Sequence, residues 1–320
     1  MEKESKIYVA GHRGLAGSAI VGQLHARGYR NLLLRTHAEL ELVDQASVRD
    51  FFGRERPDYV FLAAARVGGI VANSSYPAEF IHGNLAVQTN VLHESWRAGV
   101  KRLLFLGSSC IYPRDCPQPM REDYLLTGPL EATNRPYAVA KIAGIEMCWS
   151  YNRQYGTRFL AAMPTNLYGP GDSYDLNNSH VLPALIRKMH EAKKGGRDEV
   201  VIWGTGSPMR EFLYSGDMAE ACVHLLDLPD PGFEEFVSDT SPPLVNIGCG
   251  EDRSIAELAQ TVARVVGFRG SLRFDTSKPD GTPRKLLDSG RINALGWRPR
   301  TPIDAGIALA YQDFLSRNPG

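Results

Sequence analysis

The sequence predicts an α/β fold in which a doubly wound parallel sheet is followed by a smaller C-terminal α/β lobe. Through the first half, short apolar runs alternate with helical patterns, which is typical of repeated βαβ units. The strand-like runs are KIYVAG, NLLLRT, YVFLAAA, RLLFLGSS and RFLAAMPTN, and helices are expected from Leu15, from about Pro77 to Gly99 and from Tyr137. This alternation predicts a Rossmann-type domain.

Beyond Tyr168 the alternation loosens, because segments rich in glycine and proline separate the elements. Helices are expected near Leu182–Ala192, Ile255–Val266 and Ile303–Phe314, and strands at VVIWG and VNIGCG. We therefore predict a Rossmann domain over residues 1–168, rejoined by parts of 212–240 and 286–318. Residues 169–320 are expected to form mainly a discontinuous substrate-binding lobe.

The composition argues against several classes of partner. Basic and acidic residues balance at 36 each in 320 residues, without a block of like charge, so no nucleic-acid surface or polybasic membrane patch is expected. A small-molecule substrate is the expected partner. The polar N-terminus and the lack of a membrane-length apolar run predict a cytoplasmic protein. Five cysteines without C-x-x-C spacing predict reduced thiols and no metal site.

Three glycines follow the first predicted strand with the spacing Gly11-x-x-Gly14-x-x-Gly17 and open a helix. Glycines at such positions permit a tight turn and let backbone N–H groups and the helix N-terminus approach a pyrophosphate. An ordinary glycine-rich turn is the alternative. The βαβ context favours binding of a dinucleotide cofactor.

The second predicted strand ends at Arg35 and His37, where an enzyme that uses NAD usually presents an acidic residue to the ribose. Together with Arg13 in the glycine turn, these cations suit a 2′-phosphate, so NADPH is expected over NADH. The alternative is that they are solvated charges at a strand end. Asp44 is placed where it meets the adenine, and Ala64 lies in a run of small residues expected beneath the cofactor.

A candidate catalytic group follows the fourth predicted strand. Ser108 lies at the end of this strand, and Tyr137 and Lys141 are four residues apart, so they share one face of a helix. The ammonium is expected to lower the pKa of the phenol, which makes Tyr137 a proton donor to an alkoxide formed by hydride addition. Ser108 is expected to hydrogen-bond the same oxygen. The pattern therefore predicts carbonyl reduction.

Cys110 and His180 are candidates for additional proton transfer. Cys110 lies two residues beyond Ser108, and in an extended chain these two side chains point the same way. A thiolate beside Lys141 is able to remove a proton next to a carbonyl, although a buried packing cysteine is the ordinary alternative. His180 begins a second-lobe helix and is the complementary acid, with capping or packing as its alternative.

Runs along the whole chain carry a closer resemblance. They are VAGHRGLAGSAI, VGGIVAN, FLGSSCIYP, YAVAKIAGIE, MPTNLYGP, NSHVLPALIRK, WGTGSPMREF and KPDGTPRKLLD. In these runs the chain resembles the GDP-L-fucose synthases, a family of extended short-chain dehydrogenases/reductases. The resemblance implies epimerisation of GDP-4-keto-6-deoxy-D-mannose at C3 and C5, followed by NADPH-dependent reduction at C4.

The same resemblance implies residue roles. Ser108, Tyr137 and Lys141 carry the reduction, while Cys110 and His180 act as base and acid in the epimerisations. The implied cofactor-binding residues are Gly11, His12, Arg13, Gly14, Leu15, Ala16, Gly17, Arg35, Lys141, Pro164, Thr165, Asn166, Leu167 and His180. The implied GDP-sugar residues are Lys188, Trp203, Arg210, Asp280 and Lys285. A homodimer through helices of the Rossmann half is usual for this superfamily and is expected here.

Some residues depart from the family pattern. His37 and Lys188 stand where the family commonly has arginine, and the segments Gly171–Asn178 and Tyr214–Asp217 also differ. A related enzyme acting on another 4-keto sugar nucleotide is therefore an alternative, as is a redox-neutral epimerase of the same fold. The intact Ser/Tyr/Lys set disfavours a cofactor-binding protein without activity.

Overall fold

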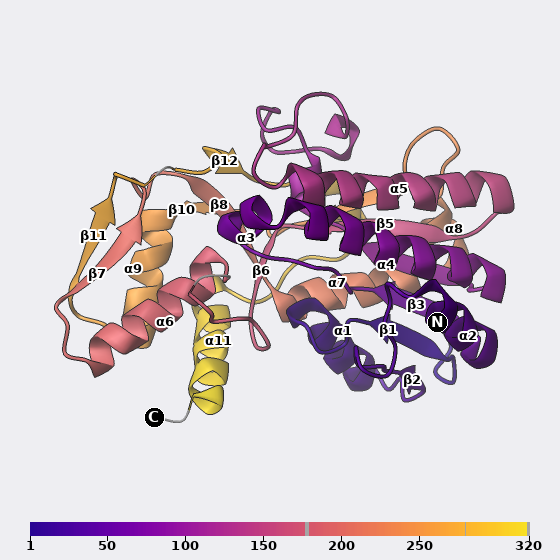
Figure 1. Cartoon of the computed structure of the whole chain (residues 1–320), viewed down its shortest axis with the longest axis horizontal. Helices are drawn as coiled ribbons and strands as arrows, with labels where there is room; N and C mark the ends of the chain where they lie inside the picture. The colour runs from indigo at the N-terminus through magenta and orange to yellow at the C-terminus, as the bar shows by residue number, and fades with distance from the viewer. Residues whose placement is uncertain (177–178, 279, 319–320) are drawn as a thin grey trace.

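The computed structural model describes residues 1–176, 179–278 and 280–318 (Figure 1). The strands of its larger part are β1 (Ile7–Ala10), β2 (Leu32–Leu33), β3 (Tyr59–Leu62), β4 (Arg102–Leu106), β5 (Phe159–Pro164) and β9 (Leu244–Ile247). They form a six-stranded parallel sheet in the order β2-β1-β3-β4-β5-β9. From β1 the chain moves outward to β2 on one side, and from β3 it moves outward to β4 and β5 on the other. The boundary between β1 and β3 is therefore the switch point, where α/β sheets bind ligands.

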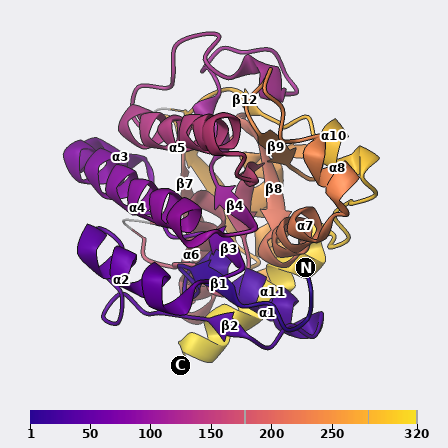
Figure 2. The same cartoon turned by 90° about the vertical axis from the view of Figure 1, so that its right-hand side faces the viewer.

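Helices cover both faces of this sheet, as Figure 2 shows. On one face lie α1 (Leu15–Ala26) and α7 (Ser215–Asp227), and on the other α2 (Gln45–Glu55), α4 (Pro77–Ala98) and α5 (Arg135–Tyr155). Shorter elements are α3 (Ile70–Ser75), α8 (Asp230–Glu234), α10 (Gly290–Ala294) and the 3-10 turns Ser109–Ile111 and Glu122–Tyr124. This double cover explains why five of the six strands are buried throughout and mainly apolar. None of the helices in the described ranges has the length and apolarity needed to cross a membrane.

The smaller lobe lies beside the carboxyl ends of the large sheet (Figure 1). Its helices are α6 (Val181–Lys194), α9 (Ile255–Val266) and α11 (Ile303–Arg317), and its strands are β6 (Asn166–Tyr168), β7 (Glu199–Trp203), β8 (Met209–Tyr214), β10 (Asp252–Ser254), β11 (Ser271–Asp275) and β12 (Arg284–Lys285). β8 pairs with β6, β10 and β12, while β7 pairs with β11. The three helices share a separate apolar core, which makes the lobe a second packing unit.

Three details differ from the sequence-based expectations. α5 begins at Arg135 rather than Tyr137, since Pro136 suits a first helical turn. Leu244–Ile247 was expected in the lobe, but β9 pairs with β5 and completes the large sheet. Within 286–318, Ile292 packs against the large sheet, whereas Ile307 on α11 belongs to the core of the lobe. A short apolar run has no feature that specifies which sheet it joins, so tertiary packing decides which sheet that is.

Candidate active site

The glycine turn after β1 keeps the start of α1 open. Gly11 adopts φ +84°, and its carbonyl accepts the Gly14 N–H at 3.0 Å. A Cβ on Gly17 would lie 2.1 Å from the Gly11 oxygen, and a Cβ on Gly11 would lie 2.7 Å from the Ala64 nitrogen. No side chain caps α1 at Gly14. The first-turn amides therefore remain available to an anion, as a pyrophosphate site requires.

A cavity of about 680 Å³ extends from this turn across the carboxyl ends of the large sheet. Sites of this volume ordinarily accept cofactors or small molecules. Most of the predicted cofactor and catalytic residues line it: Gly11, Gly14, Leu15, Ala16, Gly17, Arg35, His37, Ala64, Ser108, Tyr137, Lys141, Pro164, Thr165, Asn166, Leu167 and His180. The structure thus brings together residues that come from both halves of the chain.

Four of the predicted cofactor and catalytic residues do not line this cavity: His12, Arg13, Asp44 and Cys110. Asp44 is the N-cap of α2, and its carboxylate accepts the Ala46 N–H at 3.1 Å. The Asp44 side chain is exposed and is engaged by the helix end rather than by the cavity. Arg13 is also exposed, beside the glycine turn.

The wall also contains residues that the sequence reasoning missed. Apart from Glu41 and Arg66, they are mostly apolar or small residues, chiefly Leu40, Leu42 and Val43 after β2, Val67 after β3, and Gly83 and Val87 on α4. Val43 and Val67 are exposed hydrophobics, 42% and 62% accessible. Large apolar side chains left exposed beside a cavity are a usual sign of a ligand wall. A sequence pattern does not show that exposure.

Basic residues at the far edge of the cavity already have acidic partners. Arg35 Nη2 lies 3.0 Å from Glu55 Oε1, and His37 Nε2 lies 2.7 Å from Glu41 Oε2. Arg35 also stacks over Phe51, 5.6 Å from the ring centroid. Both side chains line the cavity, so a phosphate there has to compete with two carboxylates for them.

Ser108, Tyr137 and Lys141 meet on one wall of the cavity. Ser108 follows β4, while the other two lie on the first turns of α5. The Lys141 ammonium donates to the Leu106 carbonyl at 2.7 Å and lies 5.7 Å from the centroid of the Tyr137 ring. The lysine is thus fixed beneath the phenol by the end of β4, as a carbonyl-reducing site needs.

The acid–base properties of this group follow burial. Burial raises the pKa of Tyr137 above its ordinary value. For the protein alone, the expectation that the nearby Lys141 ammonium lowers the pKa of this phenol is therefore wrong. Burial likewise lowers the pKa of Lys141 to about 8. The reason is that desolvation disfavours both charged forms, and Lys141 directs its hydrogen bond to a backbone carbonyl instead of the phenol.

Cys110 is not in extended chain, contrary to the expectation. It lies in the 3-10 turn Ser109–Ile111, and its N–H donates to Ser108 Oγ at 3.5 Å. The turn still keeps it next to the catalytic group, because it interacts electrostatically with Tyr137, Lys141 and Lys285. Burial raises the pKa of the Cys110 thiol, while the Ser108 hydroxyl, Lys285 and Lys141 act in the opposite direction.

His180 is the N-cap of α6 and lines the cavity, with no cap bond from its imidazole. Desolvation lowers the pKa of His180. The ring is therefore available to exchange a proton inside the cavity. Of the preceding segment that departs from the family pattern, Asn177 and Asn178 lie outside the described residues.

The predicted GDP-sugar residues lie in the lobe. Trp203 at the end of β7 is 60% exposed, with the Lys188 and Lys278 ammonium groups 5.6 and 5.7 Å from its ring. The carboxylate of Asp280 accepts the N–H and the hydroxyl of Thr205 at 2.9 and 2.7 Å. It thereby fixes the turn that follows Trp203. The exposed indole offers a flat surface on which a base can stack.

Three cations form a row across the lobe sheet. Arg253 of β10 and Lys285 of β12 are both register partners of Arg210 on β8, so the three side chains leave the same face. Among the described residues, Arg210 and Lys285 have no ion-pair partner, and burial lowers the pKa of each. Like charges side by side repel, so the row favours an anionic ligand.

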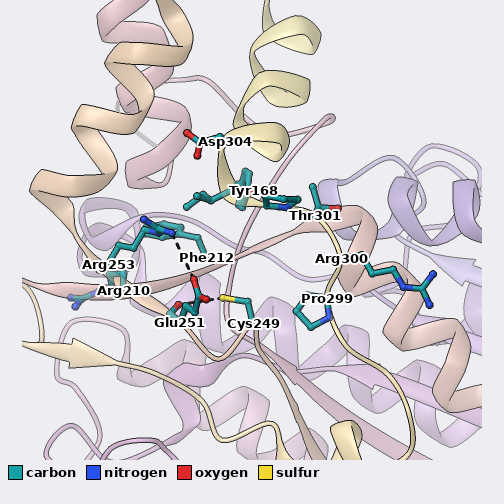
Figure 3. Close-up of a pocket in the computed structure, with 12 residues that line it drawn as sticks. Tyr168, Arg210, Phe212, Cys249, Glu251, Arg253, Pro299, Arg300, Thr301 and Asp304 are labelled. Carbon is teal, nitrogen blue, oxygen red and sulfur yellow. Dashed lines mark hydrogen bonds and ion pairs between the residues drawn. The ribbon is translucent and has the colours of Figure 1, made fainter.

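A second, smaller cavity of about 370 Å³ lies between β8, β10 and the start of α11 (Figure 3). Its lining includes Tyr168, Phe212, Cys249 and Thr301, but none of the predicted catalytic or cofactor residues. Arg210 contributes to the wall, although Figure 3 shows its guanidinium extending outward to one side. The two cavities are therefore distinct, and the candidate chemistry belongs to the larger one.

The sheet order and the glycine turn are those of a dinucleotide-binding α/β enzyme. The chain belongs to the NAD dependent epimerase/dehydratase family, whose model matches residues 7–248. It is 54% identical to GDP-L-fucose synthase of Escherichia coli (strain K12), covering 98% of this chain and 97% of that protein. GDP-L-fucose synthase 1 of Arabidopsis thaliana is 56% identical, covering 98% and 94% respectively.

A solved structure is similar over the whole chain. It is the GDP-mannoheptose C4 reductase from Campylobacter jejuni with NADP bound, with a TM-score of 0.89 and 42% identity. The match covers 98% of this chain and 99% of that one. The Rossmann-type fold predicted from the sequence is thereby confirmed.

Proposed function

We propose that this chain converts GDP-4-keto-6-deoxy-D-mannose to GDP-L-fucose, by epimerisation at C3 and C5 and then NADPH-dependent reduction at C4. Two relatives above 50% identity over nearly the whole chain carry the name GDP-L-fucose synthase, which supports the substrate and product. The observation that carries the chemistry is the meeting of Ser108, Tyr137, Lys141 and His180 on one cavity. These groups supply both a carbonyl-reducing set and a proton-transfer residue.

NADPH fits the larger cavity. The turn at Gly11 and Gly17 has no room for a Cβ, which is the close backbone approach that a pyrophosphate requires. Arg35 and His37 would hold the 2′-phosphate, and Thr165 and Asn166, which follow β5 and line the cavity, would lie at the nicotinamide end. When bound, NADPH supplies the hydride that reduces C4.

The 4-keto group makes epimerisation possible, because it acidifies the C–H bonds at C3 and C5. The Cys110 thiolate removes the proton, and the C–H electron pair moves to form an enolate whose O4 accepts hydrogen bonds from Ser108 and Tyr137. His180 returns a proton to the opposite face, which inverts the centre. Lys141 and Lys285 favour the thiolate against the effect of burial.

The same oxygen is used in reduction. As hydride reaches C4, Tyr137 donates its phenolic proton to O4, so the carbonyl becomes a hydroxyl. Lys141 stabilises the phenolate that remains, since its ammonium is fixed beneath the ring. One oxyanion site therefore serves all three steps, and reduction comes last because it removes the acidifying carbonyl.

The lobe holds the GDP part of the substrate. Arg210 and Lys285 in the cation row, together with Lys188, bind the diphosphate. Trp203 provides an exposed ring surface for the guanine, and Asp280 fixes the adjoining turn. Binding the nucleotide remote from the reacting sugar lets its binding energy orient C4 against the cofactor.

Product identity tests the proposal. Purified protein with NADPH and GDP-4-keto-6-deoxy-D-mannose is expected to yield GDP-L-fucose with one NADPH consumed per product, as measured by chromatography and NMR. In D₂O, deuterium is expected at C3 and C5, and a Cys110→Ser variant is expected to lose it. Product without deuterium, or turnover without NADPH consumption, would contradict the proposed reaction.

A second candidate is reduction of a related 4-keto GDP-sugar. The reductase of Campylobacter jejuni, which is named for a mannoheptose, is 42% identical, and this chain departs from the fucose-synthase pattern at Tyr214–Asp217. Competition between the two substrates, measured as a ratio of kcat/KM, distinguishes these candidates.

We also propose a homodimer through α4 and α5, because these helices pack together and α5 carries the exposed side chains of Val139 and Tyr155. Sedimentation of the pure protein tests it.

A further inference from the structure

Glu211 is a fully buried carboxylate that has no catalytic role in the scheme above. It lies in β8 between Arg210 and Phe212, with 0% of its surface exposed. Its Oε1 accepts the Gly250 N–H at 2.8 Å, and its Oε2 accepts the Leu287 N–H at 3.0 Å. No cation pairs with it among the described residues. Burial raises the pKa of this carboxyl, and a buried carboxyl group without a paired cation is costly, so its retention calls for a reason.

The two bonds of the carboxylate join separate segments. Gly250 follows β9 of the large sheet, whereas Leu287 comes two residues after Lys285 on β12. β12 is a strand of only two residues, and the segment after it also bonds to the Met120 backbone through Leu286 and Asp288. The Leu287 N–H bond ties this segment to the side chain of Glu211, so it helps to set where the Lys285 ammonium lies relative to the large sheet.

The backbone of Glu211 makes a different connection. Its carbonyl accepts the Thr165 hydroxyl at 3.2 Å and the Asn166 amide at 2.9 Å. Both of these residues line the cofactor cavity. One residue thus contacts the cofactor wall through its main chain and the substrate strand through its side chain.

The neighbouring glycine fits this arrangement. A Cβ on Gly248 would lie 2.3 Å from Glu211 Oε1, so the carboxylate needs glycine there to reach the Gly250 amide. Because successive side chains alternate across a strand, Glu211 lies on the face opposite Arg210. The carboxylate is therefore directly behind the cation row and cannot touch its ligand.

We propose that Glu211 is a positioning residue that sets the cation row Arg253–Arg210–Lys285 at the correct distance from the cofactor cavity for a nucleoside diphosphate-sugar. This inference rests on the proposed function, since it assigns the diphosphate to that row. The side chain governs substrate affinity, and the main chain supports the cofactor wall. A substitution of the Glu211 side chain therefore separates the effect on substrate affinity from the effect on cofactor binding.

The test is Glu211→Gln. The amide is isosteric but places an NH₂ group against one of two backbone N–H groups, so one of the bonds is lost. We expect the Kd for GDP, measured by calorimetry, to rise about tenfold or more, while the Kd for NADPH stays within about twofold. The loss is expected in the KM for the GDP-sugar rather than in kcat.

Asp217→Asn is the matched control. Asp217 is also buried, and its carboxylate accepts two backbone amides, from Arg300 at 3.2 Å and Thr301 at 2.9 Å. It connects α7 to the segment before α11 and makes no bond to the cation row. Its variant is expected to lose thermal stability to a similar extent but to keep the affinity for GDP.

The measured affinities for GDP and NADPH test the positioning role of Glu211 separately from the proposed function. Unchanged GDP affinity in Glu211→Gln, or equal weakening of GDP and NADPH, overturns the positioning role. If that variant does not fold, Gly248→Ala displaces the same carboxylate and is judged by the same two affinities. Wild-type protein that binds NADPH but not GDP contradicts the proposed function itself, which separates that failure from a failure of this inference.

Discussion

The glycine turn and the cation row are built in opposite ways. The turn uses the backbone of consecutive residues, Gly11–Gly17, and two of its glycines are required because a Cβ would meet neighbouring main chain. The row uses side chains from three short strands that are far apart in the sequence. The glycine turn is therefore fixed by residues that are neighbours along the chain, whereas the cation row depends on the register between strands that are distant in the sequence.

This difference determines how each responds to change. In the turn, a single added methyl group meets rigid backbone, so damage is local and affects the cofactor. In the row, each cation depends on hydrogen bonds elsewhere, such as that of Glu211 to Leu287. We expect substitutions to separate cofactor affinity from substrate affinity along this division.

The largest effect is expected where both regions converge, at Tyr137. Tyr137→Phe removes the proton donor to O4, so kcat for NADPH oxidation should fall about 10²- to 10⁴-fold while NADPH still binds. Deuterium incorporation at C3 and C5 should slow but not stop, because Ser108 still donates a hydrogen bond to the enolate oxygen. Tyr151→Phe in the same helix is the control, since its hydroxyl contacts His93 at 2.8 Å away from the cavity. Full reductase activity in Tyr137→Phe would contradict the site.

The backbone side of the comparison is tested by Gly17→Ala. The new Cβ would lie 2.1 Å from the Gly11 oxygen, which forces the turn open. The Kd for NADPH, from fluorescence titration, should rise about 100-fold. Gly22→Ala in the same helix meets nothing within 4 Å and should stabilise the fold by about 0.5–1 kcal/mol. Equal NADPH affinity in the two variants would show that the turn does not hold the cofactor.

The side-chain region is tested within one strand. Lys285→Gln removes a cation of the row and should raise the KM for the GDP-sugar about 10- to 100-fold with little change in NADPH affinity. Arg284→Gln is the control, because Arg284 is exposed and ion-paired with Asp252 at 2.5 Å. If both variants raise KM equally, the row has no special role in substrate binding.

The smallest effect is one of pH on folding. Burial lowers the pKa of Lys141 to about 8, so between that value and its ordinary 10.5 the unfolded chain binds more protons than the folded one. The penalty for burying the ammonium is full below pH 8 and is relieved as pH rises. From pH 7 to 9 the wild type should gain about 1 kcal/mol in unfolding free energy relative to Lys141→Met. Denaturant titrations that give parallel pH profiles would contradict this shift.

Much of the site could be predicted from the sequence because its elements are local. The spacing of Gly11, Gly14 and Gly17 and the i, i+4 placement of Tyr137 and Lys141 depend only on turn and helix geometry. The state of Cys110 could not, since the 3-10 turn that contains it forms in the folded environment. Nor could the apolar wall at Val43 and Val67, because exposure is a property of the assembled surface.

The sequence by itself determined the βαβ alternation, the glycine turn and the residue types of the catalytic group, because these follow from periodicity and from the conformational freedom of glycine. Only the tertiary structure decided that β9 joins the large sheet, that burial raises the pKa of Tyr137, and that Arg210 and Lys285 stand side by side. Register and burial depend on contacts between distant segments, and a linear pattern does not contain them.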